Sequence, residues 1–499
     1  MLFNSDLFLF AFLPVIYVGF IVSARFSSSA ASLLLVVGSC IFYAHWRFDF
    51  LPLLLGSAAA NYLCGQGIAR LSSVRPHAAR ALLGAGVAGN LALLGYYKYA
   101  DFLAGAVGFE GIFSGILLPI GISFYTFTQT AYLVDVHDEP SKVVSDPIRY
   151  LLFVTFFPHL VAGPILHHRD MMPQFAFDAR GDQRLQDFVV GSALFIMGLF
   201  KKVILADSVQ PYTALAFTSE PISTVSAWAG ALAFSLQLYF DFSGYSDMAL
   251  GLARLFGVRF PLNFDSPYKA ESIIEFWRRW HMTLSRFLRD YLYIPLGGNR
   301  SGLGHLPNLM ITMVLGGLWH GAGWTFLAWG ALHGGYLIVN HMWRRLRARF
   351  PEIFAARPGS AVVGRLLTFV CVVVGWVFFR ADSMEQAVRV VHAMAGHGTG
   401  AALACPAGAG SATVYACWAG MPTAFWWIAG LLAIAWLLPN SQQIMSRWNP
   451  ALSPIRPAGP IARALSFYPG FLWAVALGAM LASALVWLHA DSVFLYYQF

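Results

Sequence analysis

Charged residues are scarce in this chain of 499 residues. Lysine and arginine together number 32 and aspartate and glutamate 24, so charged residues make up 11% of the sequence. A typical soluble domain is about 25% charged, and so few charges could not cover the surface of a soluble protein of this length. Hydrophobic residues make up 58%. The composition therefore excludes a water-soluble enzyme and a disordered chain, and it predicts an all-α, polytopic membrane protein.

Cysteine is also rare, and the common catalytic signatures are missing. The five cysteines form no CxxC pair and no metal-ligand spacing, so we expect neither a disulfide scaffold nor a metal site. The chain contains no HExxH, Walker A or GxSxG motif. Residues 84–89 match GxGxxG, but they lie inside an apolar run, where close helix packing is the better explanation.

Long apolar runs, by contrast, are abundant. A helix needs about 20 apolar residues to cross a hydrocarbon core of about 30 Å. The runs predict ten to twelve transmembrane or re-entrant helices in a single membrane domain over residues 1–499. The candidates lie at residues 7–23, 48–64, 81–97, 112–134, 189–205, 225–239, 324–341, 361–379, 423–438 and 467–488, with shorter runs at 32–43, 150–165 and 306–319.

Loop charges predict how the chain is oriented. The loops at residues 70–80, 344–349 and 439–463 carry arginines and no acidic residue, so the positive-inside rule assigns them to the cytoplasm. Asp101, Glu110, residues 393–420 and both termini then fall outside. The outer loop contains Cys405 and Cys417, which could pair in an oxidising compartment or remain free thiols.

The strongest candidate site lies in residues 306–341, which contain no formal charge. Gly321 and Gly323 break this stretch and both flanks are basic, which predicts a helical hairpin rather than a through-span. Residues 306–319 give about 21 Å of helix, enough to bring the apex deep into a bilayer. His320 lies at this apex, and an ionisable residue there is a functional candidate. The alternative is a buried neutral histidine bonded to a carbonyl.

A basic segment upstream, residues 275–290, predicts an amphipathic helix in the cytoplasmic interface. Its apolar side chains recur at spacings of three and four, and His281 is expected to point inward beside them. A plain interfacial helix is the alternative. Asp241 ends another apolar run, and we expect it to pair with an arginine or a backbone group rather than to act in catalysis.

Together these motifs resemble the membrane-bound O-acyltransferase (MBOAT) superfamily, and more closely its bacterial polysaccharide branch, which includes alginate- and cellulose-acetylating systems. The similarity runs nearly from end to end of the chain. Its matching blocks lie at residues 118–125, 157–164, 237–248, 275–281, 289–300, 317–321 and 494–499.

The resemblance implies a ring of helices around a deep funnel, with His320 as the essential catalytic residue and His281 as the second active-site histidine. It further implies that acetyl comes from a cytosolic donor, acetyl-CoA, with no tightly bound cofactor. The acetyl group would cross the bacterial inner membrane to a periplasmic SGNH-type partner of a polysaccharide synthesis and export complex. Alginate is the favoured polymer and cellulose the alternative, and no nucleic acid partner is expected.

An imidazole suits this chemistry because a hydroxyl acceptor is a weak nucleophile at neutral pH. We predict that His320 acts as general base, which typically contributes 10²–10⁴-fold; a transient acyl-imidazole is the variant. Arg278 and Arg279 are expected to attract the phosphates of coenzyme A, with lipid anchoring as the alternative. Trp319 and Asp241 complete the candidate substrate-binding residues.

Two other functions fit a membrane protein with buried polar residues. A transporter or flippase more often shows paired repeats with broken helices in corresponding halves, and no internal repeat is visible here. A non-catalytic scaffold of a polysaccharide export complex is the third possibility. Loss of acetyl ester on a normally exported polymer in a His320→Ala strain would separate the acyltransferase from both.

Overall fold

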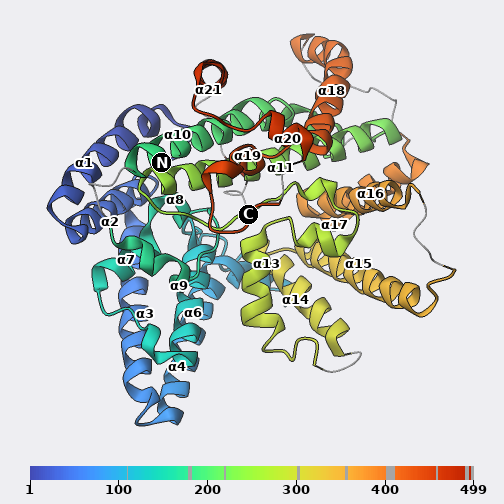
Figure 1. The fold of residues 1–499 in the computed structure, drawn as a ribbon. Coiled ribbons are helices and arrows are strands. Elements are labelled where there is room, and N and C mark those ends of the chain that lie inside the picture. Colours follow the sequence, from blue (N-terminus) through green and yellow to red (C-terminus); the bar gives the residue numbers. More distant parts are fainter. Residues whose placement is uncertain are drawn as a thin grey trace.

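The computed structural model is helical throughout the part of the chain that it describes (Figure 1). It describes residues 1–109, 111–177, 183–218, 221–300, 304–353, 358–399, 411–456, 459–488 and 494–495, with only the backbone described in 411–421. The predicted pairing of Cys405 with Cys417 and the predicted position of Glu110 lie outside these described residues.

The helices differ widely in length along the chain. In the first part they are α1 (Leu13–Phe26), α2 (Ser28–Ala44), α3 (Leu51–Ser72), α4 (Pro76–Leu94), α5 (Ala100–Ala106), α6 (Ile122–Asp138), α7 (Pro147–Thr155), α8 (Phe157–Leu160), α9 (His168–Met171) and α10 (Gln183–Phe200). They continue with α11 (Thr224–Leu255), α12 (Ile273–Trp277), α13 (Met282–Leu288), α14 (His305–His320), α15 (Trp324–Arg349), α16 (Ser360–Arg380), α17 (Met384–His392), α18 (Ser411–Leu437), α19 (Ser441–Ile444), α20 (Pro460–Ala464) and α21 (Phe471–Val486).

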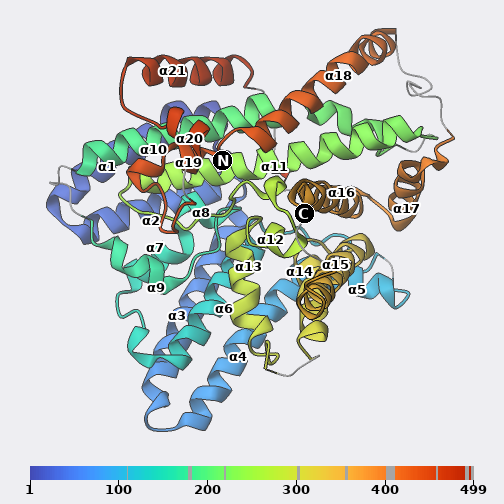
Figure 2. The same ribbon diagram turned by 45° about the vertical axis from the view of Figure 1, so that its right-hand side comes forward.

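Helices α10 and α11 lie side by side across the middle of the molecule (Figure 1, Figure 2). They run antiparallel with their backbones in close contact at paired glycines. A Cβ atom at Gly198 would lie 2.6 Å from the Gly244 carbonyl oxygen, and one at Gly191 would lie 2.7 Å from that of Gly251. Small residues allow such close packing in membrane proteins. The first half of α11 packs into the core of the C-terminal part, and its second half packs into the core of the N-terminal part.

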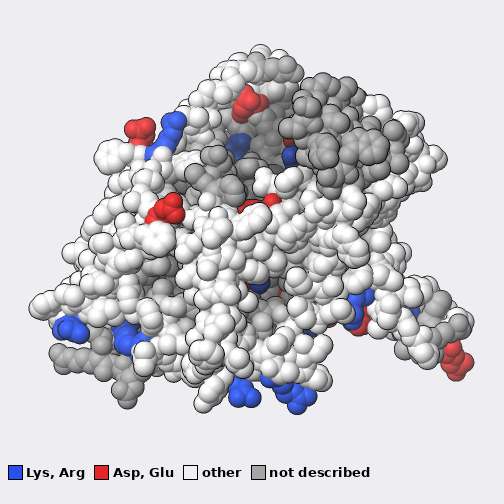
Figure 3. Space-filling model, turned by 90° about the horizontal axis from the view of Figure 1, so that it is seen from above, with Lys and Arg blue, Asp and Glu red and all other residues white. Residues whose placement is uncertain are grey.

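Several helices present apolar side chains on the outside of the molecule. Val15 and Val18 on α1 and Val363 and Leu367 on α16 are all exposed. The face seen in Figure 3 is mostly uncharged, with charged side chains at scattered points. Such surfaces suit lipid, and the prediction of a membrane protein is confirmed. The number of ten to twelve spans stays a prediction. Within the described residues, the helical segments that are long and apolar enough to cross a membrane are Leu7–Phe26, Pro76–Ala106, Gln183–Leu215 and Ser360–Arg380.

The predicted hairpin is formed by α14 and α15. Helix α14 ends at His320, residues 321–323 make the turn, and α15 begins at Trp324. The two helices pack backbone to backbone, since a Cβ atom at Gly317 would collide with the Phe326 carbonyl oxygen. The glycine break in the sequence therefore marks the true apex.

Two predicted helices are broken by proline and glycine. Residues 112–134 were expected to form one span, but α6 begins only at Ile122, after Pro119 and Gly121. Gly121 has a φ of 73°, and a Cβ atom there would lie 2.7 Å from the Leu160 carbonyl oxygen. Residues 150–165 divide between α7 and α8, because Pro158 lacks the N–H that would continue α7.

Candidate active site

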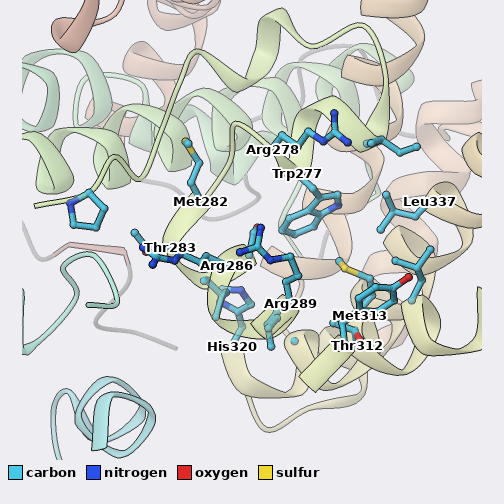
Figure 4. Close-up of a pocket in the computed structure, with 18 of the residues that line it drawn as sticks. Trp277, Arg278, Met282, Thr283, Arg286, Arg289, Thr312, Met313, His320 and Leu337 are labelled. Carbon is cyan, nitrogen blue, oxygen red and sulfur yellow. The ribbon is translucent and has the colours of Figure 1, made fainter. Parts of the chain in front are cut away.

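A cavity of about 570 Å³ lies between α13, the hairpin and the segment that links α12 to α13. Its wall combines apolar side chains with Arg278, Arg286, Arg289 and His320. Figure 4 shows His320, from the end of α14, and Arg278, from the end of α12, on different sides of this cavity. The volume is typical of small-molecule sites, which span about 300–1,000 Å³. A basic rim over an apolar interior suits a ligand with an anionic head and an apolar arm.

His320 is the last residue of α14, and it is only 5% exposed. Aromatic side chains enclose its ring, whose centroid lies 5.2 Å from that of Trp329 and 5.3 Å from that of Phe379. The His281 ring lies 6.2 Å away, centroid to centroid. The structure thus brings the two predicted histidines together from separate segments.

A second, smaller cavity of about 110 Å³ also reaches His320. Lys98, Ser123, Phe124 and Trp319 contribute to its wall. Among the described residues that line the two cavities, only His320 belongs to both. A group that enters through either cavity therefore meets the same imidazole.

The segment around His281 differs from the prediction of one amphipathic helix over residues 275–290. Two short helices, α12 and α13, are separated by residues 278–281, and His281 has a φ of 43° and a ψ of 53°. Long-range backbone bonds hold this break. The Met282 N–H donates to the Asn263 carbonyl oxygen over 2.9 Å, and the Asp265 N–H donates to the Arg279 carbonyl oxygen over 2.9 Å. The helix prediction failed because periodicity carries no information about these distant partners.

The Asn263 side chain fixes the orientation of the buried His281 ring. The Thr283 backbone N–H, which can only donate, lies 3.4 Å from Asn263 Oδ1, which identifies this atom as the carbonyl oxygen of the amide. The Thr283 hydroxyl donates to the same oxygen over 2.8 Å. His281 Nδ1 lies 3.0 Å from the same oxygen and therefore donates to it. In the neutral ring the lone pair then lies on Nε2. His281 itself does not occur among the described residues lining either cavity.

The structure separates the two arginines that were predicted to attract phosphate. Arg278 lines the larger cavity. Arg279 points elsewhere: its guanidinium pairs with Glu275, and its Nη1 lies 3.5 Å from the Ser266 carbonyl oxygen. Arg279 thus braces the break between α12 and α13, and only Arg278 remains a candidate for the donor.

The two other predicted substrate-binding residues, Trp319 and Asp241, are also separated in the structure. The buried Trp319 ring lines the smaller cavity and stacks on Phe127 with 5.3 Å between centroids. Asp241 lies away from the cavities on α11, where Lys202 Nζ is 2.6 Å from Oδ1 and the Leu495 N–H donates to Oδ2 over 3.2 Å. The predicted pairing of Asp241 with a backbone group is confirmed, but its cationic partner is lysine instead of arginine. Asp241 therefore has its partners inside the protein and lines neither cavity.

Sequence reasoning missed three residues that hold the site. Asn263 orients His281, and Lys98 and Tyr99 contact the end of α14. Lys98 carried a signal in the sequence, because it directly follows an apolar run and a lysine at membrane depth is costly unless it has a role. Asn263 carried none, since nothing in the sequence around it shows that this segment folds back on His281.

Comparisons with known proteins point to O-acyltransferases. The model of the MBOAT, membrane-bound O-acyltransferase, family matches residues 136–378. The peptidoglycan O-acetyltransferase of Helicobacter pylori is 40% identical over 435 residues, which is 79% of this chain and 80% of that protein. The probable alginate O-acetylase AlgI of Azotobacter vinelandii is 44% identical over 79% of this chain and 78% of its own length. That of Pseudomonas aeruginosa is 43% identical over 80% of this chain and 76% of its own length.

Proposed function

This chain belongs to the membrane-bound O-acyltransferase family and is an O-acyltransferase, and from that premise we propose that it passes acetyl groups from cytosolic acetyl-CoA across the bacterial inner membrane for O-acetylation of an exopolysaccharide. One observation carries the proposal: His320 lines two cavities that share no other described residue. A donor in one cavity and an acceptor in the other would meet at one imidazole.

The larger cavity is the proposed donor side. Its wall contains Arg278, Arg286 and Arg289, and the positive-inside rule assigns such an arginine-rich rim to the cytoplasm. Arg286 already pairs with Asp170 over 2.8 Å, and Arg289 pairs with Asp290 over 2.7 Å. Arg278 has no acidic partner within 4.0 Å in the described structure, which makes it the best candidate to bind a phosphate of coenzyme A.

The proposed reaction at His320 is attack of an acceptor hydroxyl on the thioester. The acceptor oxygen forms a bond to the acetyl carbonyl carbon while the imidazole removes the hydroxyl proton. The carbon–sulfur bond then breaks, and the imidazolium returns the proton to the leaving thiolate. Burial among Trp329 and Phe379 keeps water away from the thioester. An acyl-imidazole on His320 is the two-step variant, and it predicts a burst of free coenzyme A in the absence of acceptor.

The acceptor side is the smaller cavity, which has room for little more than the end of a chain. We propose that a periplasmic SGNH-type partner presents a hydroxyl there and carries the acetyl group on to the polymer. Alginate is the favoured polymer because relatives named alginate O-acetylase are 43% and 44% identical to this chain. The peptidoglycan O-acetyltransferase relative, at 40% identity, makes peptidoglycan the second candidate.

A His320→Ala strain tests the proposal, with His392→Ala, an exposed histidine on α17, as the matched control. We expect His320→Ala to lower acetyl ester on the polymer by about 10²–10⁴-fold, the usual contribution of a general base. Polymer yield and the amount of the protein in the membrane should stay normal, and His392→Ala should match wild type. Retained ester in His320→Ala would contradict the mechanism, and loss of the polymer itself would favour a transporter or scaffold.

A further inference from the structure

The C-terminal end of α14, which carries His320, is fully hydrogen-bonded, and two side chains from another helical segment supply three of the four bonds. An α-helix leaves its last four carbonyl oxygens without a partner of its own, and such groups must find donors in a protein interior or a membrane. All four have one here. The donors are the Gly321 N–H to Gly317 O at 3.4 Å, the Tyr99 hydroxyl to Leu318 O at 2.9 Å, and Lys98 Nζ to Trp319 O at 2.6 Å and to His320 O at 3.0 Å.

The Lys98 ammonium is completely engaged in this contact. It has three N–H groups, and its third acceptor is Ser123 Oγ at 3.4 Å, in the first turn of α6. Its positive charge also lies at the negative end of the α14 dipole. Because all three donors are used by the protein, Lys98 holds the backbone at His320 and offers no donor to a substrate.

Local backbone geometry explains how neighbouring residues reach one helix end. Lys98 and Tyr99 lie in a π-helical turn, Gly95–Tyr99, that follows α4. Such turns are rare and occur often at functional sites. The turn also lies within Pro76–Ala106, one of the candidate membrane spans. A lysine inside such a span is costly and is usually retained for a role.

We propose that Lys98, assisted by Tyr99, is a positioning residue that fixes His320 at the junction of the two cavities. The proposal rests on the proposed function, because it assigns a role in the same reaction. His320 has to meet both a donor and an acceptor, and a displacement of about 1 Å in a reacting group can lower a rate about 10²-fold. Beyond the apex the chain continues into the turn at 321–323, where Gly321 and Gly323 have an extended backbone.

Three substitutions in the full-length protein test this role. Lys98→Met removes the charge and all three donors at similar side-chain length, and Tyr99→Phe removes a single hydroxyl. Lys269→Met is the matched control, because Lys269 Nζ also donates to a carbonyl at a helix end, Leu438 O at 2.6 Å, and Lys269 lines neither cavity. Acetyl ester on the polymer is measured per unit of protein in the membrane.

We expect Lys98→Met to lower ester per unit of protein by about 10- to 100-fold and Tyr99→Phe to lower it by a few fold, with Lys269→Met unchanged. In membrane vesicles supplied with acetyl-CoA, the maximal rate of Lys98→Met should fall while the half-saturating concentration stays constant, because the donor rim is untouched. A merely structural lysine would lower protein abundance and leave the rate per molecule unchanged.

Two outcomes overturn the proposal: a Lys98→Met protein with more than half of the wild-type ester per molecule, or a loss that only follows its abundance. If Lys98→Met does not accumulate, Tyr99→Phe decides, and wild-type activity in that variant overturns the proposal. A His320→Ala protein that still acetylates would instead refute the proposed function. An inactive His320→Ala with an active Lys98→Met would refute the role of Lys98 alone.

Discussion

The two histidines of the site lie on backbone breaks of different origin. His320 ends a regular helix and is followed by a glycine turn, so its place on the backbone is set largely by nearby residues. His281 has a left-handed backbone between two short helices, and bonds to Asn263, far away in the sequence, hold it there. One proposed catalytic residue can therefore be located from local sequence, whereas the position of its neighbour depends on the assembled fold.

Among the variants that test this comparison, Gly321→Ala is expected to lower acetylation the most. A Cβ atom at Gly321 would collide with the Phe326 ring, so the ring or the turn that carries His320 must shift. We expect about a 100-fold loss of acetyl ester per unit of protein. Gly335→Ala, on the same hairpin, is the control, because a Cβ atom there meets no atom within 4 Å. Equal activity of the two variants would show that the turn does not position His320.

The next largest effect distinguishes the role of the His281 ring in acetylation from the role of its backbone conformation in stability. Asparagine accepts left-handed backbone better than most residues, so His281→Asn should keep the stability of the purified protein while acetylation falls about tenfold or more. His281→Val should in addition destabilise the protein by about 1–2 kcal/mol, since a β-branched residue is strained at a φ of 43°. Thermal unfolding in detergent and ester analysis give the two readouts. Full activity of His281→Asn would remove the ring from the mechanism.

Asn263→Leu tests the long-range contact that holds His281. The substitution leaves His281 Nδ1–H and the Thr283 hydroxyl without their acceptor, and each buried unsatisfied donor costs about 1–3 kcal/mol. We expect a lower unfolding temperature together with a loss of acetylation of about tenfold. Asn440→Leu, which removes bonds to Asp265 and Ser266, should lower stability without the same loss of activity per molecule.

The smallest effect distinguishes the two adjacent arginines. Arg278→Ala should raise the half-saturating concentration of acetyl-CoA up to about fivefold, because an exposed ionic contact contributes about 1 kcal/mol or less. Arg279→Ala should leave that concentration unchanged and lower protein abundance, since it breaks the pair with Glu275. Initial rates in membrane vesicles distinguish the two. A similar shift in both variants would contradict the separation seen in the structure.

Much of the fold could be predicted from the sequence, and the failures have common causes. Composition and apolar runs were sufficient for the class and for helices such as α1, α10 and α16. The hairpin was predicted because Gly321 and Gly323 interrupt an uncharged stretch. The prediction failed at residues 112–121, where Pro119 and Gly121 precede α6, and at the break before His281. In each failure a contact distant in sequence competes with local helix preference.

The site, like the fold, was predictable from the sequence only in part. The sequence by itself determined that this is a membrane protein and that His320 ends an apolar helix at a glycine turn, since hydropathy and glycine act locally on the backbone. Only the tertiary structure decided that His320 joins two cavities, that Arg278 but not Arg279 lines one of them, and that Lys98 and Tyr99 bond the end of α14. These features depend on which helices pack together, because buried polar groups take their partners from whatever element lies beside them.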